Sequence, residues 1–286
     1  MLTYEDTLFN FDNLINIQIG EKPILALNKF NSTAGILSNI MMGGYSDAEA
    51  DGENTQPVNN KLKAYVSNVH IRNAKIVADD DFIGIVGGIF GDVSLFTTIE
   101  NCSMYNAEII AHNASNVGGI AGQTATSTLI KACLFEGSID GGVEVGGITS
   151  TSASDDKISN CHTNATLIGS RTIGGIIGTS DRTYINNCFV EGEITLNDNA
   201  VEARVGSIAG QINYNYQDTV DIVLDNNIID IANITIPKKV TTRYVHRVVG
   251  HSSGDNWEYD WDNIDWSQPQ SQWPRLYQSA DRCLRN

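Results

Sequence analysis

A six-residue phrase, Val-Gly-Gly-Ile-x-Gly, recurs in full or nearly in full five times in the middle of this chain. Its copies begin at Val86, Val117, Val145, Ile173 and Val205, so the steps between them are 31, 28, 28 and 32 residues. A period of about 20 to 50 residues is typical of a chain built from one supersecondary unit stacked on copies of itself, each too small to bury its own apolar face. The repeat therefore predicts a solenoid.

A second repeated line lies between these phrases. It has four positions: an apolar residue, a variable residue, a third residue that is usually Asn, and a small residue. Its six copies span residues 66–69, 99–102, 130–133, 158–161, 185–188 and 224–227. Because Asn tolerates a left-handed backbone and can bond to an Asn on the next coil, we expect this line to form a bend between sheets.

The runs between the bends indicate strands. Each unit of 28 to 32 residues holds about three short runs of β-branched and apolar residues, and none shows an apolar stripe at helical spacing. A β-propeller blade would need about 40 residues, and a leucine-rich repeat would show Leu at fixed offsets. The predicted fold is all-β: a single-stranded parallel β-helix of six or seven three-strand coils with caps at both ends.

The repeated glycines have a physical explanation within such a fold. A side chain at these positions would either project into a narrow core or block a turn with positive φ that bends one sheet into the next. We therefore assign a structural role to Gly87, Gly118, Gly146, Gly174 and Gly206.

Four of the five cysteines occupy one line of the repeat, where Val69 stands in the earliest copy. Exchange with Val indicates a small, buried, apolar role, and side chains that point in parallel rarely meet disulfide geometry. No metal-ligand spacing accompanies them, so no metal site is predicted. The residues with this structural role are Cys102, Cys133, Cys161 and Cys188.

The charge balance limits the partners. Eighteen basic and 34 acidic residues give a net charge of −16, which repels phosphate backbones and anionic membranes. No stretch approaches the ~18 apolar residues of a membrane span, and residues 1–6 lack the basic start of a secretory leader. We expect neither nucleic-acid binding nor membrane insertion. We expect the protein to lie at the cell surface or outside the cell if a leader was removed, and inside the cell otherwise.

Three regions are predicted. Residues 1–62 form an N-terminal cap with a worn first coil and an acidic loop, residues 63–250 form the repeats, and residues 251–286 form a Trp-rich C-terminal cap. Caps are needed because an open end of a β-helix exposes unpaired backbone groups. An end without a cap can instead pair with the end of another molecule, which would be self-association through coil edges.

Carboxylates and tryptophans are the candidate binding residues. The acidic clusters fall in turns at different repeat positions, so general acid-base catalysis across coils has little support and no catalytic residue is assigned. No cofactor is predicted. A cation such as calcium could bind these carboxylates, but no calcium-loop motif supports such a site. The candidates are Asp79, Asp80, Asp81, Asp155 and Asp156 in turns, with Trp257, Trp261 and Trp266 near the end of the chain.

The Gly-Gly phrases resemble the GLUG-type repeats of bacterial adhesin-like surface proteins and of the non-catalytic region of IgA1-cleaving metallopeptidases. The resemblance covers roughly residues 63–250, and the ending Trp273-Pro274-Arg275-Leu276 is similar to those that close such arrays. It implies a surface-exposed binding or display module with no catalytic residues to carry over.

The leading hypothesis is a non-enzymatic β-helical module that recognises a protein or carbohydrate ligand. One alternative is a polysaccharide lyase or glycoside hydrolase of the β-helix type, which requires two or three carboxylates within about 5 to 10 Å of one another. The other is a structural spacer or assembly subunit that associates through exposed strands.

Overall fold

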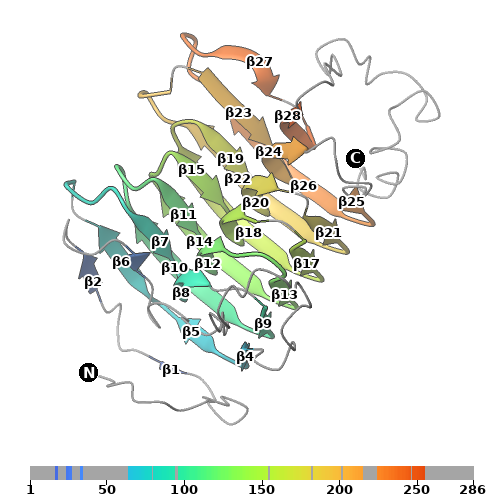
Figure 1. Ribbon diagram of the computed structural model, residues 1–286. Helices are drawn as coiled ribbons and strands as arrows, with labels where there is room; N and C mark the ends of the chain where they lie inside the picture. The colour runs from blue at the N-terminus through green and yellow to red at the C-terminus, as the bar shows by residue number, and fades with distance from the viewer. Residues whose placement is uncertain are drawn as a thin grey trace, which may run out of the picture.

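The structure is a computed structural model that describes residues 17–18, 24–27, 33–34, 64–78, 80–93, 96–153, 155–181, 183–200, 202–214, 224–245 and 247–254. These residues form strands, bends and turns without a helix. All paired strands run parallel and stack into a β-solenoid of about five turns (Figure 1). The predicted all-β parallel solenoid is confirmed.

Each turn passes through four sheets in the order D, A, B, C. Sheet A contains β1 (Ile17–Gln18), β2 (Ile24–Leu27), β5 (His70–Arg72), β6 (Lys75–Ala78), β10 (Ser103–Ile110), β14 (Leu134–Asp140), β18 (His162–Gly169), β22 (Phe189–Leu196) and β26 (Ile228–Thr235). Sheet B contains β3 (Thr33–Ala34), β7 (Ile85–Gly87), β11 (Asn116–Gly118), β15 (Glu144–Gly146), β19 (Thr172–Gly174), β23 (Glu202–Gly206) and β27 (Thr241–Val245).

Sheet C contains β8 (Phe90–Val93), β12 (Ala121–Thr124), β16 (Thr149–Ser152), β20 (Ile177–Asp181), β24 (Ala209–Tyr214) and β28 (Val249–Gly254). Sheet D contains β4 (Ala64–Ser67), β9 (Thr97–Glu100), β13 (Leu129–Lys131), β17 (Lys157–Ser159), β21 (Tyr184–Asn186) and β25 (Leu224–Asp225).

The turn therefore carries four strands, and the predicted number of three is wrong. The Asn residue of the Asn line has a left-handed backbone that bends sheet D into sheet A, so these two sheets each contribute a separate strand to the turn. At Asn101, φ is 52°, and its Nδ2 donates to Asn68 Oδ1 at 2.6 Å. The predicted Asn bend with a bond between coils is confirmed for this pair. Positive φ recurs at Asn68, Asn101, Ala132, Asn160, Asn187 and Asn226.

The repeated glycines mark the bend from sheet B to sheet C. An added Cβ at Gly118 would lie 1.8 Å from the carbonyl oxygen of Ala121, so the bend closes on its own backbone. The structural role is confirmed. Its cause is steric, because φ is not positive at any of the repeat glycines and the positive-φ alternative is wrong. The same contact at 1.7 to 2.3 Å occurs at Gly87, Gly118, Gly146, Gly174 and Gly206.

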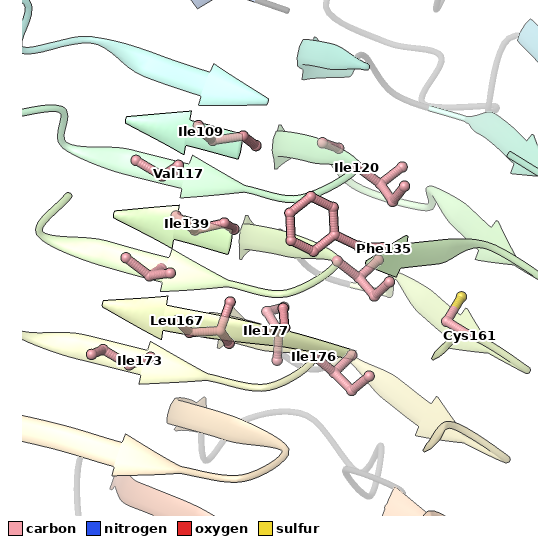
Figure 2. Packing of buried hydrophobic residues seen from close by; sticks show 14 of the residues in the cluster. Ile109, Val117, Ile120, Phe135, Ile139, Cys161, Leu167, Ile173, Ile176 and Ile177 are labelled. Carbon is pink, nitrogen blue, oxygen red and sulfur yellow. The ribbon is translucent and has the colours of Figure 1, made fainter. Parts of the chain in front are cut away.

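The core consists of apolar rows that run along the solenoid axis. The Val or Ile before each Gly-Gly pair points inward and is fully buried, as Val117 and Ile173 show in Figure 2. Rows from sheet A, including Ile109, Ile139 and Leu167, meet them from the other side. Burying each of these side chains contributes about 1.5 to 3 kcal/mol, so stacking identical lines stabilises every turn.

The cysteine line lies inside the bend from sheet D to sheet A. Each thiol is buried and free of disulfides, and that of Cys161 lies 3.7 Å from the carbonyl oxygen of Ile130 on the preceding turn. Burial and the neighbouring thiols raise the pKa of Cys161 above its ordinary value. The predicted buried, unpaired role is confirmed for Cys102, Cys133, Cys161 and Cys188.

The N-terminal segment adds short strands before the first full turn. β1, β2 and β3 pair in parallel with β5, β6 and β7. Ala34 is the register partner of Val86, which begins the first Gly-Gly phrase. The Trp-rich segment lies outside the described residues, and the predicted coil number, caps and boundaries stay predictions.

Candidate functional site

The predicted carboxylates lie at two different bends. Asp80 and Asp81 are exposed in the turn between sheets A and B. His112 on the next turn lies between two carboxylates, 3.8 Å from Asp80 Oδ1 and 3.5 Å from Asp140 Oδ2. Asp155 and Asp156 lie instead at the bend from sheet C to sheet D. The candidates Asp79, Trp257, Trp261 and Trp266 lie outside the described residues.

Asp156 is buried rather than displayed, with 2% of its surface exposed. Its Oδ2 accepts a bond from the Thr124 hydroxyl at 2.6 Å, and its Oδ1 accepts the backbone N–H of Thr128 at 2.7 Å. Removal from water outweighs these bonds and raises the pKa of Asp156 to about 7. Thr128 and Thr183 precede the flanking sheet D strands at the equivalent place, so this carboxyl group closes a bend instead of meeting a ligand.

Sheet A, the largest sheet, presents an apolar strip on its outer face. Its members lie on neighbouring strands in register, one per turn. The rings of His162 and Phe189 stack with their centroids 4.8 Å apart, and Ile228 is 43% exposed. We define the apolar strip as Leu134, His162, Phe189 and Ile228.

Polar and charged side chains border the apolar strip. A parallel row two residues further along each strand holds Glu136, Asn164, Glu191 and Asp230. His162 Nε2 lies 2.9 Å from Glu191 Oε1, which orients the imidazole against the ring of Phe189. The strip thus combines an apolar surface with hydrogen-bond acceptors. Our sequence reasoning missed it, although each member directly follows the fourth residue of the Asn line and was detectable from the repeat register.

A second set of side chains follows the bend between sheets B and C, which we call the B–C seam. Its sheet B row consists of Ile85, Asn116, Glu144, Thr172, Arg204 and Tyr244. Its sheet C row consists of Asp92, Gln123, Thr151, Thr179, Gln211 and His251.

The two rows of the seam contact each other. Asn116 Nδ2 bonds to Thr151 Oγ1, which also donates to Glu144 Oε2 at 3.2 Å. Further along, the rings of Tyr244 and His251 lie 4.4 Å apart. At these turns, residues of two different repeat lines thus contact each other across the bend.

No described group of three or more His, Cys, Asp or Glu side chains is arranged to hold a metal ion. The described part of the chain also holds no helix of the length and apolarity needed to cross a membrane. Comparisons with protein-family models, curated proteins and solved structures give no match.

Proposed function

We propose that this protein is a non-enzymatic β-helical binding module that recognises a protein or carbohydrate ligand through the outer face of sheet A. The apolar strip carries this proposal. A row of partly exposed apolar and aromatic side chains costs solubility unless a partner covers it, whereas the other sheet A rows are mostly polar or charged.

The chemistry of the strip supports both ligand classes. The stacked rings of His162 and Phe189 offer a flat apolar surface for a sugar ring or an aromatic side chain. The carboxylates of Glu136 and Glu191 supply acceptors for hydroxyl or cationic groups at its border. A regular strand spacing of about 4.8 Å repeats this pattern along the axis.

The repeat supports a place in an adhesin-like surface protein of the GLUG type. The steric demand at the five glycines explains why that phrase recurs without any catalytic task. In this proposal the repeats form a rigid rod, and the variable outward side chains determine the ligand.

The test is a binding screen on arrays of oligosaccharides and purified extracellular proteins, followed by variants. Phe189→Ala should weaken the binding of any ligand found by about tenfold or more, because the substitution removes the centre of the apolar strip. Tyr65→Ala is the matched control, since Tyr65 is 44% exposed on sheet D. Equal losses in both variants would contradict the assignment of the face, and cleavage of any oligosaccharide would contradict a non-enzymatic role.

A further inference from the structure

The outer face of sheet A divides into two parts that differ in charge. In the first part, formed by β5, β6 and β10, the charged groups have partners within the sheet. Lys75 Nζ lies 2.8 Å from Glu108 Oε1, and the Arg72 guanidinium lies over the Tyr105 ring, 5.1 Å from its centroid. This part therefore balances its own charge.

The second part is acidic. Its strands β14, β18, β22 and β26 lie side by side (Figure 1) and contain no Lys or Arg. Among the described residues, the basic groups that approach its carboxylates are imidazoles: His162 lies near Glu191, and His112 lies near Asp140. The carboxylates of these strands are Glu136, Asp140, Glu191, Glu193 and Asp230.

Two of these carboxylates lie opposite each other on neighbouring strands. Glu191 and Asp230 are register partners on β22 and β26. Like charges at directly opposite positions destabilise a sheet. We call Glu136, Glu191 and Asp230 the acidic border of the apolar strip. A cationic partner relieves this repulsion, whereas a neutral or anionic partner leaves it in place.

The apolar strip and the acidic border are both accessible without a groove. Ile228 is 43% exposed, Asp230 two residues further along is exposed, and the Glu191 side chain keeps 30% of its surface. An open face of this kind suits contact with another polypeptide, because protein interfaces combine an apolar centre with a polar rim.

We propose that this part of sheet A binds a basic amphipathic helix of a partner protein. Apolar side chains of the helix cover the apolar strip, and its Lys and Arg side chains pair with the acidic border. This inference rests on the proposed function and names the partner that the same face recognises.

The spacing of the apolar strip favours a helix that lies along the solenoid axis. The strip repeats at about 4.8 Å and a helical turn advances ~5.4 Å, so three steps leave a mismatch of about 2 Å. Alternate residues of an extended strand advance ~6.6 Å, so the same three steps leave about 5 Å. A second copy of this chain fits less well, because each copy carries a net charge of −16.

The experiment is isothermal titration of the full chain with three synthetic peptides of equal length. The first has Leu at every third or fourth position and Lys elsewhere. The second has Glu in place of each Lys, and the third has the composition of the first in an order without a helical period. The first peptide should bind more tightly than the other two, with an affinity that falls as salt is added.

Charge variants test the acidic border. Glu136→Gln combined with Asp230→Asn should weaken binding of the first peptide about threefold or more, because two exposed ion pairs are lost. The matched control is Asp198→Asn combined with Glu202→Gln, which changes the net charge equally at exposed positions between sheets A and B and should keep the affinity. Equal losses in the two double variants, equal binding of the three peptides, or no binding of the first would each overturn the inference.

Phe189→Ala distinguishes a failure of this inference from a failure of the proposed function. It should weaken the first peptide, because the helix covers the apolar strip. An oligosaccharide ligand or a self-association that requires Phe189 would keep the face and overturn the helical partner. A peptide whose affinity depends on Glu136 and Asp230 but not on Phe189 would overturn the role of the apolar strip, and with it both proposals.

Discussion

Replacing Asp156 by asparagine should remove a pH dependence from the stability of this protein. The wild-type carboxyl group is buried at the bend between sheets C and D, and its pKa is raised to about 7, chiefly by burial. An asparagine keeps the bonds to Thr128 and Thr124, because its Oδ1 can accept the Thr128 N–H and its Nδ2 can donate to Thr124 Oγ1. Thr124 can then donate to the Thr151 carbonyl oxygen, which already lies 3.4 Å away.

The sign follows from proton binding. In the unfolded chain an aspartate has a pKa of ~3.9, so between about pH 4 and pH 7 the folded state holds a proton that the unfolded state has released. Stability therefore falls as the pH rises through this window, and the full penalty is present above pH 7. The difference between the two pKa values, at 1.36 kcal/mol per pH unit, corresponds to about 4 kcal/mol.

The assay is urea unfolding of wild type and Asp156→Asn at intervals from pH 4 to pH 8. The free energy of unfolding of wild type should fall relative to the variant by about 4 kcal/mol over this range, since contributions of all other groups cancel in the difference. Asp155→Asn is the control: it removes the neighbouring charge, which is the last of the causes that raise the pKa of Asp156, so most of the pH dependence should remain. Parallel curves, or a wild type that gains stability relative to the variant as the pH rises, would refute the reasoning.

Three further changes test the solenoid itself. Gly146→Ala should lower the free energy of unfolding, measured in urea, by more than about 3 kcal/mol, because the added Cβ would lie 1.8 Å from the Thr149 carbonyl oxygen. A variant whose urea midpoint equals that of wild type would show that the bend can open to accept the methyl group. Ala132→Asn should stabilise by about 1 kcal/mol and raise Tm by about 2–4 °C, since Ala132 has φ 53° where other turns have Asn, and Asn160→Ala should do the opposite. Cys161→Val should cost less than about 1.5 kcal/mol in the same urea assay, since the thiol fills an apolar position, and a larger loss would indicate that the sulfur contact to the preceding turn matters.

The sequence alone determined the lines that repeat. Stacking of the turns places Val117 beside Val145 and Asn101 beside Asn68, so that residues one period apart in the sequence form a row of contacts in space. The parallel solenoid, the buried thiols and the Asn bends all follow from this relation. They were predictable because the contacts along a row involve equivalent residues whose types can be read directly.

Only the tertiary structure decided which residues of different rows lie next to each other. The number of strands per turn depends on the number and the angles of the bends, and the repeat period alone does not give it. Burial of Asp156 depends on how the bend from sheet C to sheet D closes, and a pair of adjacent aspartates in a turn gives no sign of it. The B–C seam brings Thr151 of sheet C against Asn116 and Glu144 of sheet B. These contacts join residues of different repeat lines, and a one-dimensional period carries no information about them.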